Sequence, residues 1–269
     1  MAEPILEARQ VSKRYRLRAG MFAAQAAAIS AVDRVSCSLK RGETLGLVGE
    51  SGCGKTTLAK LLVGLLSPEE GEVVVCGQRF ARLRGEPLRR LRRAVQFVFQ
   101  DPMNSLNPRL TVEETLAEPL IIHRLAEGPS QRRARVEELL SVVQLSAAHA
   151  RRLPRELSGG ERQRVGIARA LATDPEALIC DEPIASLDVS VGAQILELLR
   201  RVNRERGTAL LFISHDLRAV ASLCERIAVM RQGRFLEIAP TERLLNRPGH
   251  PYTELLIRSA ELDLDTPTS

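Results

Sequence analysis

The residues Gly49-Glu50-Ser51-Gly52-Cys53-Gly54-Lys55-Thr56 match the phosphate-binding pattern G-x-x-x-x-G-K-[ST] at every fixed position. They follow the apolar run 44–48 and precede the helix-like run 57–62, which is the strand–loop–helix setting that the pattern requires. Glycines let backbone N–H groups point at phosphate oxygens, and the start of the following helix attracts the same anion. Lys55 is expected to reach the β- and γ-phosphates, and the Thr56 hydroxyl to bind Mg²⁺. A glycine turn that merely precedes a lysine is disfavoured by this setting.

The composition limits the classes of protein to consider. The 269 residues allow one large domain or two small ones, and 44% apolar with 27% charged residues is typical of a globular protein. Aromatic residues make up 3%, which disfavours a single-strand nucleic-acid binder, because such proteins stack bases on aromatic rings. The net charge of +6 admits nucleic acid, an anionic membrane surface or simply a solvated surface. Five dispersed cysteines without a C-x-x-C pair indicate reduced thiols in a cytosolic protein. We find no signal-peptide pattern and no apolar run of about 18–20 residues, so work at a membrane is expected to need another chain.

Strand-like and helix-like segments alternate along most of the chain, which predicts a parallel sheet sandwiched by helices. Between Thr111 and about Leu157 the apolar spacing is helical with no strand, which predicts a helical insertion. Residues 18–30 are expected to form a loop or a loose insertion. The other predicted elements are strands at 4–17, 32–39, 73–76, 95–99, 177–180 and 208–214, a hairpin over 227–238, and helices at 86–94, 112–122, 130–144, 161–173, 190–205, 241–246 and 251–260.

The apolar strand 177–180 ends in two carboxylates, Asp181 and Glu182. At the C-terminal edge of a parallel sheet, we expect them to lie near the cation of the phosphate loop. Asp181 suits Mg²⁺ binding through water, and Glu182 suits polarising the water that attacks the γ-phosphate. The phosphate loop in the same chain disfavours the alternative, a strand that ends in two solvated acids.

A second helix start has the composition of an anion site. Leu157-Ser158-Gly159-Gly160-Glu161 precedes a helix-like run, and short polar and glycine residues at a helix start receive anions. From the residues alone, this stretch could equally be only a helix cap.

With these motifs together, the sequence resembles the nucleotide-binding subunits of ATP-binding cassette (ABC) transporters along nearly its whole length. The resemblance implies an α/β fold: a P-loop ABC ATPase with a RecA-like mixed or parallel sheet core, an N-terminal antiparallel β subdomain and an inserted α-helical subdomain. It implies a nucleotide-binding domain over 4–252, a helical subdomain over about 101–160, and a short helical tail over 240–269. It also implies that each ATP is sandwiched in a dimer between one phosphate loop and the signature Leu157–Glu161 of the other domain.

The resemblance gives roles to single residues. Tyr15 matches the aromatic platform that stacks on adenine; the alternative is an ordinary strand-edge residue. Gln100 matches a glutamine that approaches Mg²⁺ and the attacking water, and His215 matches a switch histidine that contacts the γ-phosphate and holds Glu182; the alternative for His215 is a solvated side chain. The implied catalytic residues are Glu182, His215 and Gln100. The implied Mg²⁺ ligands are Thr56, Gln100 and Asp181. The implied ATP-binding residues are Tyr15, Gly49, Glu50, Ser51, Gly52, Cys53, Gly54, Lys55, Thr56, Thr57, Ser158, Gly159, Gly160, Glu161 and Asp188.

Three stretches resemble the peptide and nickel importer branch of the family: Phe99–Pro108, Asp188–Val191 and His250-Pro251-Tyr252-Thr253. The branch implies ATP and Mg²⁺ as cofactors, two permease subunits, an extracytoplasmic solute-binding protein, and a second ATPase that is either a sister chain or this chain itself. The implied place is the cytoplasmic face of the bacterial plasma membrane, reached through partners only. The complete signature together with Glu182 predicts competent halves for both ATP sites. The cysteine cluster of longer members is not found, so no iron–sulfur site is expected.

The cargo stays open between peptides and nickel or metal chelates, because the ATPase subunits do not touch it. The alternative function is a soluble ABC ATPase that acts on nucleic acid, ribosomes or cofactor assembly. Relatives of that kind carry long coiled coils or two joined cassettes, and this chain shows neither pattern. An exporter ATPase is disfavoured by the stretch Phe99–Pro108.

Overall fold

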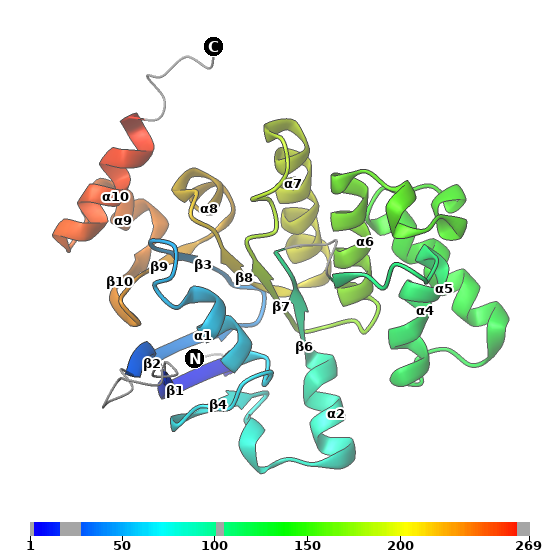
Figure 1. Cartoon of the computed structure of the whole chain (residues 1–269), viewed down its shortest axis with the longest axis horizontal. Helices are drawn as coiled ribbons and strands as arrows, with labels where there is room; N and C mark the ends of the chain where they lie inside the picture. Colours follow the sequence, from blue (N-terminus) through cyan, green and yellow to red (C-terminus); the bar gives the residue numbers. More distant parts are fainter. Residues whose placement is uncertain (1–2, 17–27, 101–104, 263–269) are drawn as a thin grey trace, which may run out of the picture. The chain divides into compact units, whose positions relative to one another are not determined.

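A computed structural model of the chain describes residues 3–16, 28–100 and 105–262 (Figure 1). The chain divides into two compact units, residues 1–83 with 211–269 and residues 84–210. Strand β8 (Ala209–Ile213) carries the chain from the second unit back into the first.

The first unit combines strands of both directions with short helices (Figure 1). Its elements are β1 (Pro4–Arg16), β2 (Ala28–Lys40), β3 (Thr44–Val48), α1 (Lys55–Leu62), β4 (Glu70–Val75), β5 (Gln78–Arg79), a 3-10 turn (Phe80–Arg82), α8 (Leu217–Leu223), β9 (Arg226–Arg231), β10 (Arg234–Pro240), α9 (Thr241–Asn246) and α10 (Pro251–Leu262).

Two sets of strands frame helix α1 in this unit. Strands β2, β1, β4 and β5 form an antiparallel sheet in that order. Strand β3 pairs in parallel with β9, which pairs antiparallel with β10. All five residues of β3 are buried, as expected for a parallel strand covered on both faces. On one side of α1, the side chains of Leu58, Leu61 and Leu62 are buried. Burial of each contributes about 1.5–3 kcal/mol to stability.

The second unit holds the predicted helical insertion. Its elements are α2 (Gly85–Ala94), β6 (Val95–Val98), α4 (Val112–Ile122), α5 (Gly128–Val142), 3-10 turns (Ala147–Arg151 and Pro154–Glu156), α6 (Gly159–Leu171), β7 (Ala177–Asp181) and α7 (Val189–Arg206).

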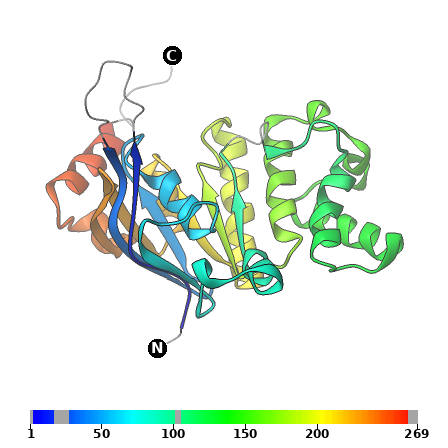
Figure 2. The same cartoon turned by 60° about the horizontal axis from the view of Figure 1, so that its bottom comes forward.

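Strands β6 and β7 pair in parallel, with Val98 opposite Cys180. Between them, the described residues form only helices and turns, and Figure 2 shows α4, α5 and α6 clustered together, in green. Arg164 of α6 connects this helix to the end of α5 and to α7. Its guanidinium donates to the Val143 carbonyl at 2.7 Å and to Gln194 Oε1 of α7 at 2.9 Å.

Most predicted elements are confirmed and differ only at their ends, whereas helix α8 (Leu217–Leu223) was not predicted. The hairpin over 227–238 turns at Gln232 and Gly233, which both have positive φ, as a two-residue hairpin turn requires. The helix predicted to start at 161 starts at Gly159, because Ser158 caps it. The loop predicted over 18–30 is wrong for Ala28–Ser30, which belong to β2; residues 18–27 lie outside the described part of the chain, as do 101–104 of the importer-like stretch. Within the described ranges, no helix has both the length and the apolar character needed to cross a membrane.

Candidate active site

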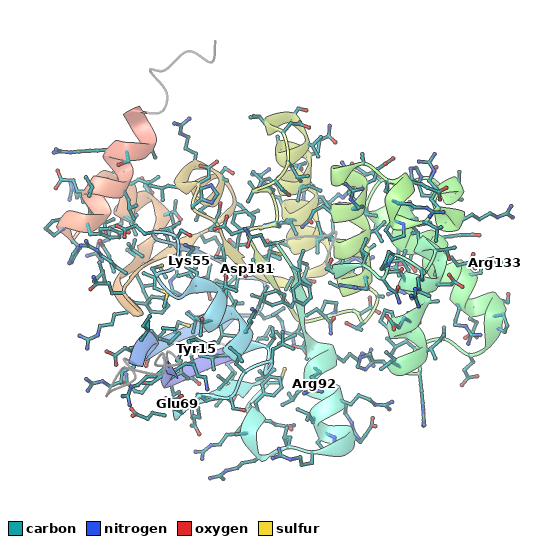
Figure 3. All side chains as sticks on the ribbon, in the orientation of Figure 1. Tyr15, Lys55, Glu69, Arg92, Arg133 and Asp181 are labelled. Atoms are coloured by element: carbon teal, nitrogen blue, oxygen red, sulfur yellow. The ribbon has the colours of Figure 1, made fainter. Side chains whose placement is uncertain are left out.

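The phosphate loop connects β3 to α1 in the first unit, and Figure 3 labels Lys55 at the start of that helix. The Lys55 side chain is 6% exposed. Its ammonium donates to the Gly49 carbonyl at 2.7 Å and to the Glu50 carbonyl at 3.0 Å. The loop therefore curls around its own lysine, which holds a positive charge at the start of α1, where an anion is favoured.

Two glycines of the loop have no room for a side chain. A Cβ at Gly49 would lie 2.1 Å from the Met230 carbonyl oxygen, and one at Gly54 would lie 2.0 Å from the Ala31 carbonyl oxygen. Gly54 also has a φ of 112°, which other residues rarely adopt. The neighbouring strands thus shape the loop, and the Gly233 N–H adds a hydrogen bond to the Cys53 carbonyl at 2.8 Å. Burial raises the pKa of the Cys53 thiol, which keeps it protonated at neutral pH.

His215 belongs to the same unit and follows β8. Its side chain is exposed, and it borders a cavity of about 400 Å³ that Gly49 also lines. The next residue, Asp216, caps α8 by accepting hydrogen bonds from the Arg218 and Ala219 N–H groups. The structure therefore brings the predicted switch histidine to the phosphate loop.

Tyr15 lies near the end of β1, opposite Ile29 of β2, and is labelled in Figure 3. Tyr15 is 42% exposed, and an exposed aromatic ring offers a surface for stacking. The adenine role remains a prediction.

The predicted carboxylates lie in the second unit. Asp181 ends β7 and is 3% exposed, whereas Glu182 is half-buried with a φ of 49°. A left-handed backbone is uncommon for a residue with a side chain and is found at functional sites more often than elsewhere. Gln100 follows β6, the strand next to β7, and is exposed. Because β6 and β7 are parallel, Gln100 and Asp181 both lie at the carboxyl edge of this strand pair.

The signature forms the start of α6 and is held by a capping box. The Glu161 N–H donates to Ser158 Oγ at 3.2 Å, and the Ser158 N–H donates to Glu161 Oε2 at 2.7 Å. The second Glu161 oxygen accepts from His149 Nε2 at 3.0 Å and lies 3.7 Å from the Arg152 guanidinium. The pKa of Glu161 is lowered to about 2, chiefly by the hydrogen bond that its carboxylate accepts from the Ser158 N–H. The carboxylate of Glu161 thus stabilises the shape of the signature.

Gly160 fixes the packing of the signature against α7. A Cβ at Gly160 would lie 2.4 Å from Val191 Cγ1, while one at Gly159 would meet Leu187 Cδ2 at an ordinary 3.4 Å. Asp188, a predicted ATP-binding residue, caps α7 by accepting from the Val191 N–H at 2.9 Å and from Ser190 Oγ at 2.7 Å. The Val191 N–H is the main cause that lowers the pKa of Asp188.

A match to the family model described as ABC transporter covers residues 32–185. The chain belongs to the ABC transporter family. The Bacillus subtilis strain 168 protein named oligopeptide transport ATP-binding protein AppF is 45% identical over 96% of this chain and 78% of the relative. The Pectobacterium atrosepticum protein named glutathione import ATP-binding protein GsiA is 46% identical over 95% of this chain, which spans 41% of that protein's length.

Among solved structures, the dimer of the ATP-binding cassette MJ0796 in a post-hydrolysis state with ADP and Pi aligns with a TM-score of 0.78 and 33% identity. The alignment covers 88% of this chain and 98% of that one. The ABC fold predicted from the sequence is confirmed, and this family member is an ATP-binding ATPase.

The residues predicted to hold Mg²⁺ in this ABC ATPase all offer oxygen. They supply a hydroxyl (Thr56), an amide (Gln100) and a carboxylate (Asp181), and Mg²⁺ prefers such ligands together with water and phosphate oxygens. Thr56 is exposed in the first turn of α1, next to Lys55. Among the residues that the structure describes, there is no group of three or more His, Cys, Asp or Glu suited to a metal.

Two contacts of this ABC ATPase were not predicted from its sequence. His149 binds the signature through Glu161, and Tyr252 binds the phosphate loop through Glu50. The sequence singled out the motif His250–Thr253, but nothing in the composition of the motif indicated that it contacts the phosphate loop. No local pattern indicated the first contact.

Proposed function

We propose that this ABC ATPase energises the import of peptides through a pair of membrane permease subunits. AppF is named for oligopeptide transport and GsiA for glutathione import, and glutathione is itself a peptide. These names favour a peptide cargo over the nickel or metal chelates that the sequence left open. The observation that carries the ATPase role is the phosphate loop, with buried Lys55 bound to the Gly49 and Glu50 carbonyls.

In the first unit, Lys55 exchanges carbonyl partners for the β- and γ-phosphate oxygens of ATP, while the N–H groups at the start of α1 bind the same oxygens. Tyr15 stacks on the adenine, and His215 contacts the γ-phosphate from the rim of the cavity that it shares with Gly49. Thr56, with Gln100 and Asp181, would hold Mg²⁺, which supplies positive charge against the phosphates when bound.

In the second unit, Glu182 accepts a proton from the attacking water, or orients that water, as the bond to the γ-phosphate forms. Its left-handed backbone sets the direction in which the carboxylate leaves β7. The N–H groups of Gly159 and Gly160 bind the γ-phosphate of an ATP held by the other ATPase domain of the dimer.

The working unit is a dimer of this chain with itself or with a sister ATPase, at the cytoplasmic face of the bacterial plasma membrane. The similarity to a dimeric ABC cassette supports the dimer. ATP closes this dimer and hydrolysis reopens it, as a shift between two populated states. A solute-binding protein outside the membrane delivers the peptide to the permeases.

The test is Glu182→Gln, which keeps the shape of the side chain but removes its charge. ATP turnover by the assembled transporter is expected to fall by orders of magnitude, because loss of the catalytic group adds several kcal/mol to the barrier. Light scattering is expected to show an ATP-dependent dimer of the variant. Glu205→Gln, at an exposed position near the end of α7, is the matched control and keeps wild-type turnover.

Unchanged turnover in Glu182→Gln contradicts the proposed role. A variant that binds ATP but stays monomeric indicates that a sister ATPase completes the dimer. Stimulation by nucleic acid or ribosomes, with none by permeases in liposomes, favours the alternative function.

A further inference from the structure

The segment His250–Thr253 contacts the phosphate loop in the first unit. Tyr252, the second residue of α10, is 4% exposed. Its hydroxyl oxygen accepts a hydrogen bond from the Glu50 backbone N–H at 3.2 Å. Because 202 positions separate the two residues, this is a tertiary contact between the loop and the last described helix.

Tyr252 has a defined position because its neighbours hold it. The Arg231 guanidinium carbon, at the end of β9, lies 4.6 Å from the centre of the Tyr252 ring, within the range of a cation–π contact. The Tyr252 N–H donates to His250 Nδ1 at 3.0 Å. The Gly249 N–H donates to the Glu237 carboxylate of β10 at 2.9 and 3.0 Å. The start of α10 is therefore tied to the β9–β10 hairpin, and so is the hydroxyl that meets the loop.

The contact restrains the loop without engaging Lys55, the residue predicted to bind the phosphates. Tyr252 engages the N–H of Glu50, and Lys55 engages the carbonyl of Glu50 at 3.0 Å. When Lys55 turns towards a phosphate, the Glu50 carbonyl loses this partner. The bond from Tyr252 involves no atom of Lys55, so it can persist through nucleotide binding and keep this end of the loop in place.

The far end of α10 reaches the segment that follows His215. Arg218 Nε of α8 donates to the Ala260 carbonyl at 3.0 Å. Leu256, Ser259 and Ala260 line the same cavity as Gly49 and His215. Helix α10 thus contacts the phosphate loop at its start and covers the neighbourhood of the switch histidine further along.

We propose that Tyr252 is a positioning residue of the nucleotide site, which holds the phosphate loop ready for nucleotide and couples nucleotide occupancy to the docking of α10. The inference rests on the proposed ATPase function. A loop held in its binding shape has less freedom to lose when nucleotide binds, so affinity rises. By reciprocity, bound nucleotide stabilises the docking of α10 to the same extent.

The variant Tyr252→Phe tests this in the full chain, because it removes the hydroxyl and keeps the ring beneath Arg231. ADP affinity, measured by titration calorimetry, is expected to fall about threefold to tenfold, the range for one hydrogen bond. In the ATPase assay, KM is expected to rise while kcat stays near wild type. The matched control is Arg258→Ala on the same helix, which breaks the exposed pair with Glu254 and is expected to keep wild-type affinity.

A Tyr252→Phe variant with wild-type ADP affinity and KM overturns the inference, even if its melting temperature falls, because the tyrosine is then only structural. A second measurement is hydrogen exchange over residues 250–256, which ADP is expected to slow in the wild type and to slow less in the variant. Exchange that is unaffected by saturating ADP also overturns the coupling. Failure of the wild type to bind ADP or ATP would instead refute the proposed function, which separates the two results.

Discussion

Two helices of this ABC ATPase start with glycine-rich sequences, yet their first turns are completed in different ways. At α6, Ser158 and Glu161 exchange hydrogen bonds and satisfy part of the helix start from within the chain. At α1, no side chain of the described residues caps the helix, and the first turn carries no acidic residue. The uncapped turn beside Lys55 is suited to a highly charged ligand, whereas the capped turn offers only its remaining N–H groups.

The two helix starts are therefore not equivalent anion sites. The phosphate loop has its own cation and a shape fixed by neighbouring strands. The signature carries a carboxylate, which disfavours an isolated anion nearby. We infer that the phosphate loop binds nucleotide by itself, and that the signature joins only when another domain presents ATP.

The substitution Lys55→Ala has the largest expected effect. It tests whether the start of α1 needs its lysine for ATP turnover. ATP turnover is expected to fall at least about 100-fold, because a buried charge-assisted contact to the transferred phosphate is lost. Phosphate release in a steady-state assay measures the loss, and Lys60→Ala, in the last turn of the same helix, is the control. A loss below about threefold would contradict the distinction between the two starts.

Gly160→Ala probes the packing of the second helix start. The new methyl group would overlap Val191, so we expect the free energy of unfolding to fall by about 1–3 kcal/mol. Urea denaturation measures this, and adding Val191→Ala is expected to restore part of the loss. The control Gly166→Ala lies on the same helix with open space around its Cβ, and it should gain about 0.5–1 kcal/mol. Equal effects at both glycines would refute the packing role.

Glu161→Gln has the smallest expected effect and tests the charge in the capping box. The pKa of Glu161 is about 2 in the folded chain, below its ordinary value of 4.5, so the contribution of its charge to stability is complete above about pH 4.5 and is lost as the pH falls towards 2. Near pH 7 the variant is expected to be less stable by about 0.5–2 kcal/mol, the range for a lost capping interaction. Unfolding followed at several pH values should show the gap between wild type and variant closing below pH 4.5. A gap that is independent of pH would show that the charge has no role.

Local signals made much of the fold and part of the site predictable. The phosphate loop, its flanking strand and helix, and the cap at Ser158 follow from residues adjacent in the sequence. The predicted helices of the insertion are confirmed because their apolar spacing is itself local.

What the sequence could not provide are contacts between distant segments. Two contacts depend on how α6 packs on its neighbours: the Val191 methyl that a Cβ at position 160 would overlap, and the histidine at 149 that binds Glu161. Tyr252 shows the same limit, because its motif was visible but its partner, Glu50, was not.

Because Glu182 has a left-handed backbone, substitutions at this position can reduce activity in two ways, by removing the carboxylate or by straining the backbone. Valine, isoleucine and threonine are poorly tolerated at positive φ, so their defects would combine a lost carboxylate with a displaced turn. Asparagine adopts this conformation more readily than most residues and lacks the charge. In a saturation library, the gap in fitness between asparagine and valine would thus report the backbone requirement, and the gap between glutamate and glutamine would report the chemistry.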